Sequence, residues 1–80
     1  MKTYSKDDIL LMGKTEFTDK FKVNSYVIIT FSDGASIDGK IQEIGLASNL
    51  NIDTRDHLPV SIKVAGKSID IFTINKIQVQ

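Results

Sequence analysis

Short apolar stretches that alternate with polar residues run through most of the chain from Val23 onward. The clearest is the segment Tyr26–Phe31, which places Val27 and Ile29 on the same face as Phe31. A period of two is the side-chain repeat of a β-strand with one buried face. The pattern therefore predicts a mainly β protein.

Turn signals divide these stretches into five expected antiparallel strands. Ser32-Asp33-Gly34 is a strong hairpin turn signal between the first two strands, and Ala65-Gly66-Lys67 is a turn between the last two. The expected strands are 26–31, 36–44, 49–53, 60–64 and 68–72, and Ile74, Ile77 and Val79 follow them.

Gly39 lies in the middle of the second expected strand. A glycine there weakens a strand and is typical of a bend or bulge, which a small barrel needs in order to close. We therefore expect a small five-stranded antiparallel barrel. Its core should contain the inward set Val27, Ile29, Phe31, Ile37, Ile41, Leu50, Ile52, Val60, Ile62, Val64, Ile69 and Ile71.

A short helix over residues 5–13 is expected before the barrel. Ser5 can cap its free amides, Asp7 and Asp8 suit its first turn, and Gly13 can end it in a left-handed conformation. So short a helix needs packing to be stable, and Ile9, Leu10 and Met12 offer an apolar face for this. The 80 residues then form one domain, with the barrel over residues 22–80.

Two phenylalanines, Phe17 and Phe21, lie four residues apart between the expected helix and the barrel. We favour core packing for them, with both rings closing one open end of the barrel, because a small domain needs its large apolar side chains inside. The alternative is an exposed stripe that binds another protein.

Composition argues against catalysis and against a metal centre. The chain has no cysteine and a single histidine, His57, in a polar loop, so we expect no enzyme activity, no metal site and no cofactor. The weaker alternative for metal is a shared loop of Asp53, Asp56 and His57. The apolar runs are too short to span a bilayer and the first residues do not resemble a signal peptide, so we expect a soluble, cytoplasmic protein without membrane contact.

The order of these features resembles the Sm/LSm/Hfq group of small RNA-associated barrels. The resemblance covers residues 5–73 and rests on the first hairpin with Asp33-Gly34, the bending Gly39, the pair Asn49-Leu50 and the strand that ends at Ala65-Gly66. The aspartate of that family falls on Gly45 and its arginine on Ala65, and the basic pair of the Hfq branch has no counterpart here.

This resemblance implies a barrel of the SH3-like or Sm-like kind and RNA binding, with Asn49 contacting a base edge. An asparagine at a strand start can instead bond its own backbone. Three lysines, Lys40, Lys63 and Lys67, point outward by parity and can form a basic strip, or they can simply be solubilising charges. Tyr26 is the candidate aromatic platform for a base. Five residues are therefore the candidate RNA-binding set: Asn49, Lys67, Lys63, Lys40 and Tyr26.

Two classes of function remain open. The first is an Sm-like RNA-binding module that acts as a ring, in which each subunit extends the sheet of its neighbour. The second is a small adaptor or inhibitor, of the kind encoded by phages or mobile elements, that binds a protein or a nucleotide-like ligand. The net charge of zero suits the second class, because nucleic-acid binders rely on basic patches. Its contact surface is expected on residues 6–12 and on the edge strand 68–72.

Overall fold

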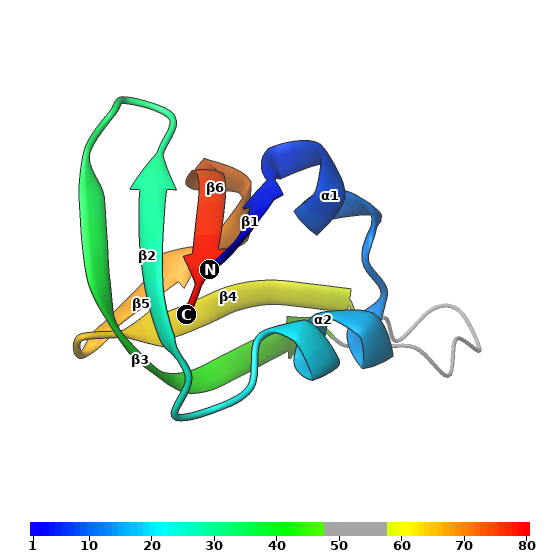
Figure 1. Cartoon of the computed structure of the whole chain (residues 1–80). Coiled ribbons are helices and arrows are strands. Elements are labelled where there is room, and N and C mark those ends of the chain that lie inside the picture. Colours follow the sequence, from blue (N-terminus) through cyan, green and yellow to red (C-terminus); the bar gives the residue numbers. More distant parts are fainter. Residues whose placement is uncertain (48–57) are drawn as a thin grey trace.

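A computed structural model describes residues 1–47 and 58–80, which form an antiparallel sheet and two short helices (Figure 1). The mainly β prediction is confirmed, but the described residues alone form six strands, where the sequence analysis expected five in the whole chain. The elements in chain order are β1 (Lys2–Ser5), α1 (Lys6–Leu11), α2 (Lys14–Lys20), β2 (Tyr26–Phe31), β3 (Ser36–Ala47), β4 (Leu58–Val64), β5 (Lys67–Asp70), the short 3-10 helix η1 (Ile71–Thr73) and β6 (Ile74–Val79).

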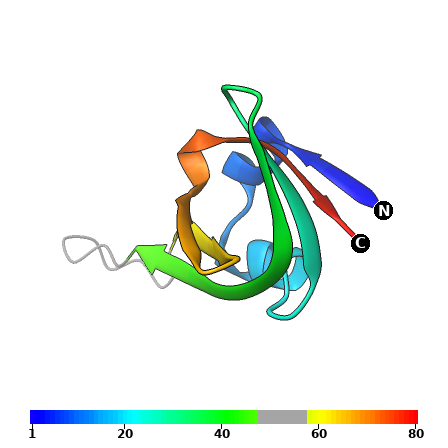
Figure 2. The same cartoon turned by 90° about the vertical axis from the view of Figure 1, so that its left-hand side faces the viewer.

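The strand order is β1-β6-β2-β3-β4-β5, and the sheet is open between β1 and β5 in the part of the chain that is described. Figure 2 shows the sheet curled around the interior, with long β3 sweeping across the view. The closed barrel is therefore not confirmed. The expected third strand, which includes Leu50 and Ile52, lies outside the described residues. The fifth strand ends earlier than expected, because Ile71 begins η1.

Gly39 marks the point where β3 changes neighbours. Residues 36–40 pair with β2, and from Ile41 onward β3 pairs with β4. Gly39 has a φ of +154°. A Cβ at this position would lie 3.2 Å from Cγ1 of Val64. The predicted bend at Gly39 is confirmed, and a side chain at this position would crowd Val64.

The core is one cluster of buried apolar side chains from the sheet and both helices. Seven members of the predicted inward set are buried, whereas Phe31 and Ile37 are partly buried against the cluster and Val60 is half-buried. The confirmed seven are Val27, Ile29, Ile41, Ile62, Val64, Ile69 and Ile71. Ile74 and Ile77 of β6 complete the sheet's share of the core.

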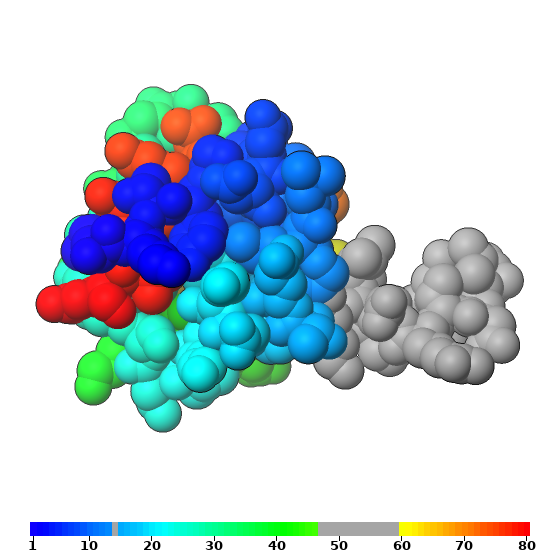
Figure 3. Space-filling model, turned by 45° about the vertical axis from the view of Figure 1, so that its right-hand side comes forward, coloured from blue at the N-terminus to red at the C-terminus, as the bar shows by residue number. Residues whose placement is uncertain are grey.

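The N-terminal segment forms two helices, where one was expected. Ser5 caps α1, accepting a hydrogen bond from the backbone of Asp8, as predicted. Gly13 does not end this helix in a left-handed conformation, because its φ is −81° and it precedes α2. Ile9 and Met12 are buried as expected, but Leu10 is exposed. Figure 3 shows β1, α1 and α2 as one continuous blue face beside the red end of β6.

Phe17 on α2 and Phe21, just after it, are fully buried. Their ring centroids lie 4.7 Å apart, and the Tyr4 ring of β1 meets Phe21 edge-on at 5.1 Å. The core-packing interpretation of these two rings is therefore confirmed, and the exposed stripe is wrong. The spacing of four residues that drew attention in the sequence is the spacing of one helical face.

Candidate functional site

The tight turn between β4 and β5 fixes the position of β5. Ala65 and Gly66 both have positive φ, at 54° and 78°. This backbone suits the type I′ turn, whose twist matches that of the flanking strands. The side-chain oxygen of Gln42 on β3 accepts a hydrogen bond of 2.7 Å from the Gly66 amide.

One side of β5 is left without a neighbouring strand among the described residues. The register pairs Val64 with Lys67 and Ile62 with Ile69. In a two-residue hairpin the pair that flanks the turn is hydrogen-bonded, and bonding then alternates along the strand. Ser68 therefore directs its backbone N–H and C=O groups away from β4, toward the open edge, and Asp70 directs its N–H there.

Asp70 turns the chain sharply at the end of β5. Its Oδ1 accepts a hydrogen bond of 2.9 Å from the Phe72 amide, and its carbonyl accepts one of 2.6 Å from the Thr73 hydroxyl. The resulting 3-10 turn buries Ile71 and leaves Phe72 57% exposed. The turn thus presents a large aromatic side chain next to the open edge.

A hollow of about 400 Å³ lies at the end of this edge, lined by Phe31, Ser32, Asp33, Phe72 and Thr73. The Ser32 amide and hydroxyl donate to the Thr73 carbonyl at 3.1 and 3.3 Å. These bonds tie η1 to the turn between β2 and β3. Asp33, the one charged residue in the lining, has its Oδ1 occupied by the Ala35 amide at 2.9 Å. The lining of the hollow therefore includes two aromatic rings and one carboxylate.

Two of the predicted RNA-binding residues lie together. Tyr26 and Lys40 are register partners on the outer face of β2 and β3. The Tyr26 hydroxyl donates a hydrogen bond to Asp38, which is exposed on the same face. This bond, with some burial and the negative charge of Asp38, raises the pKa of Tyr26. The carboxylate was not among the predicted site residues, although the hairpin register places it diagonally from Tyr26.

The other predicted residues do not join that pair into one strip. Lys63 has Glu43 and Ser68 as register partners, on the outer face of β3–β5. Lys67 is exposed, but its register partner is Val64, so it belongs to the other face of this hairpin. Asn49 lies outside the described residues, so its role stays a prediction. Because Glu43 lies opposite Lys63 and Asp38 lies two residues from Lys40, the positive charges have acidic neighbours.

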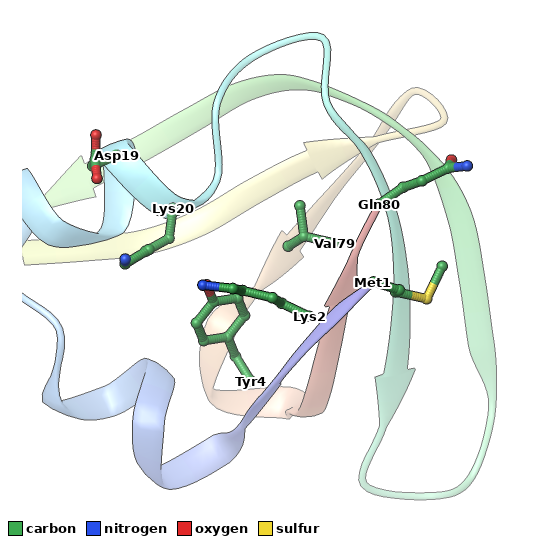
Figure 4. A pocket seen from close by; sticks show the side chains of 7 residues that line it. All are labelled: Met1, Lys2, Tyr4, Asp19, Lys20, Val79 and Gln80. Carbon is green, nitrogen blue, oxygen red and sulfur yellow. The ribbon is translucent and has the colours of Figure 1, made fainter.

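Figure 4 shows a second hollow, of about 300 Å³, between the β1–β6 pair and α2. Lys2 and Tyr4 come from β1, whereas Lys20 comes from the end of α2. Two ammonium groups and a phenol suit an anionic group. Both lysines are exposed, however, so water solvates them and competes with any such ligand.

No cluster of metal-ligating side chains occurs among residues 1–47 and 58–80. The alternative metal loop of Asp53, Asp56 and His57 falls outside those ranges. None of the described helices has the length and apolar character needed to cross a membrane.

Comparison of the chain with protein-family models, curated proteins and solved structures finds no match. The likeness to the Sm/LSm/Hfq group therefore rests on the sequence spacing alone. The candidate site with the most features in one place is the open edge of β5 with the hollow of Phe31 and Phe72.

Proposed function

We propose that this chain is a small, non-enzymatic protein-binding module that docks an extended segment of its partner along β5. The observation that carries the proposal is the edge of β5, which no strand in residues 1–47 or 58–80 covers and which the exposed Phe72 follows within two residues. Open edges are where added strands pair, since their backbone groups lack partners. Exposed aromatic side chains are common anchors in protein interfaces.

The fold suited to this role is a partly open barrel of the SH3-like type. Three features support it: β3 bends at Gly39 to serve two neighbours, a 3-10 turn separates β5 from β6, and β6 returns to pair with β2. A curled sheet of this kind supports many binding functions, so the function is argued from the edge and not from the fold.

A pull-down with three matched baits tests the proposal. Ser68→Pro removes an amide that points to the open edge, whereas Ser68→Ala keeps it. We expect the wild-type and Ser68→Ala baits to recover a protein from source cells that the Ser68→Pro bait does not. Recovery of the same proteins by all three baits would contradict docking at β5.

RNA binding is the second candidate, favoured by the register pair of Tyr26 and Lys40 on one sheet face. An aromatic ring beside a cation is the arrangement that stacks a base and neutralises a phosphate. Titration of labelled oligouridine at low and high salt tests it, because phosphate contacts weaken steeply with salt. Binding that falls with salt and is lost in Tyr26→Ala would favour the RNA function. A ring of subunits, the oligomer expected with that function, would be detected by light scattering.

A further inference from the structure

The hollow beside Phe72 specifies more about the partner than the open edge does. The geometry points to a partner segment that is extended, carries an apolar anchor side chain and has a lysine or arginine next to that anchor. This inference rests on the proposed docking along β5 and names the chemistry of the occupant.

The extended conformation follows from the backbone of β5. Ser68 directs its N–H and C=O groups to the open edge and Asp70 directs its N–H there, two residues further along the strand, whereas the Asp70 carbonyl is bonded to the Thr73 hydroxyl. A partner whose backbone groups match this spacing must itself be a strand, because a strand rises roughly 3.3 Å per residue. The occupant must therefore lie alongside Lys67–Asp70 with its main chain extended.

The apolar anchor follows from the position of the hollow. Phe72 comes two residues after Asp70, so a strand that passes Asp70 brings its next side chains to the ring. Phe31 and Phe72 supply the aromatic walls, and the space of about 400 Å³ accommodates a large side chain. Phe72 is 57% exposed, so an aliphatic or aromatic anchor would remove much of its apolar surface from water.

The basic neighbour follows from the charges around Phe72. Asp33 lines the hollow and Asp70 begins the turn that presents the ring. Each carboxylate has one oxygen bonded to a backbone amide, and its second oxygen can accept a further hydrogen bond. Both residues are exposed, so a cation beside the anchor can pair with Asp33, and one nearer β5 can pair with Asp70, without having to be buried.

A second copy of this chain that pairs its own β5 antiparallel to this edge does not fill the hollow. The residues that precede its own β5 are Ala65 and Gly66, which have too little side chain to fill a space between two phenylalanines. We therefore assign the occupant as a basic, apolar segment of another protein. Pairing with β1 of a second copy, the other open edge among the described residues, is an outcome that the oligomeric state tests.

Selection of random twelve-residue peptides on the wild-type chain tests the inference. We expect the selected peptides to share an apolar residue adjacent to lysine or arginine. Synthetic copies are then measured by fluorescence anisotropy against four variants. Ser68→Ala should bind as the wild type does, whereas Ser68→Pro and Phe72→Ala should each weaken binding about tenfold. Asp33→Asn should weaken binding less and should reduce its dependence on salt.

Amide hydrogen exchange on the wild-type chain provides a measurement that does not depend on the proline variant folding. Exchange at Ser68 and Asp70 should slow when a selected peptide is added. Two results would overturn this inference and leave docking at β5 intact. In the first, the peptides slow this exchange but lack the apolar and basic pair. In the second, they bind Phe72→Ala with the same affinity as the wild type. If no peptide is selected, or if the selected peptides slow exchange at neither amide, both the docking at β5 and the inferred chemistry of the occupant would be overturned. A wild-type dimer that Ser68→Pro abolishes in ultracentrifugation would assign the edge to a second copy and also overturn the inference.

Discussion

Gly39 on β3 faces Val64 on β4 so closely that a Cβ on the glycine would lie 3.2 Å from the valine Cγ1. This approach occurs where β3 leaves β2 and begins to pair with β4. The bend that gives the sheet its curl therefore depends on the missing side chain, and Val64 cannot retreat easily because it is fully buried.

Gly39→Val should lower the free energy of unfolding by about 1–3 kcal/mol, because the new side chain overpacks the contact with Val64 and disfavours the positive φ. Urea unfolding measures the change. Gly13→Ala is the matched control, since Gly13 has a φ of −81° and a Cβ added to it would meet no atom within 4 Å. Its stability should stay within about half a kcal/mol of the wild type. Equal stability of the two variants would contradict the role of Gly39 in the bend.

Side chains alternate between the inner and outer faces of β2 and β4, so alanine substitutions should cost much more stability at inner positions than at outer ones. Ile29→Ala and Ile62→Ala should each cost about 2–5 kcal/mol, because both side chains are fully buried and leave cavities. Thr30 and Ser61 lie on the other face, so Thr30→Ala and Ser61→Ala should each change stability by no more than about half a kcal/mol. Thermal unfolding of the four variants checks this, and overlapping losses in the two groups would show that the parity is misassigned.

The sequence was sufficient to predict the strands whose partners are close along the chain. The first hairpin and its Asp33-Gly34 turn follow from local turn chemistry, and the Gly34 amide does bond to the Phe31 carbonyl at 3.0 Å. β1 was missed because it has four residues and its partner, β6, is at the other end of the chain. No short-range pattern in the sequence indicates such a pairing.

Helix α2 was missed for a different reason. Its first position follows Gly13, which provides no side-chain cap, and threonines at positions 15 and 18 favour a helix only weakly. The buried faces of Phe17 and Phe21 stabilise it instead, and that packing depends on the sheet. In the candidate site, β5 was expected as an edge, but the hollow was not, because it joins residues 31–33 to residues 72–73.

The phenol of Tyr26 should titrate above its ordinary range. Its hydrogen bond to Asp38 is lost on ionisation, and the carboxylate repels the phenolate, so the pKa of Tyr26 is raised in the folded state. The stability that this bond contributes is present below the unfolded pKa and is lost as pH rises through the folded pKa. Ultraviolet titration in a Tyr4→Phe background isolates Tyr26, since the chain has two tyrosines. Adding Asp38→Asn should lower the pKa, and no change would contradict the bond.

Ala65 occupies a left-handed position that favours glycine or asparagine. Its φ of 54° in the turn before β5 carries a steric cost, because the Cβ lies close to neighbouring backbone atoms in this conformation. Ala65→Gly removes that steric cost from the folded state but gives the unfolded chain more conformational freedom. We expect the first effect to be larger, so the variant should be more stable by about 0.5–1 kcal/mol. Ala35→Gly is the control, because Ala35 is not among the described residues with positive φ and should lose stability through backbone freedom alone. Chemical unfolding compares the two variants. A loss of stability in Ala65→Gly would mean that the turn before β5 is not held in the left-handed conformation.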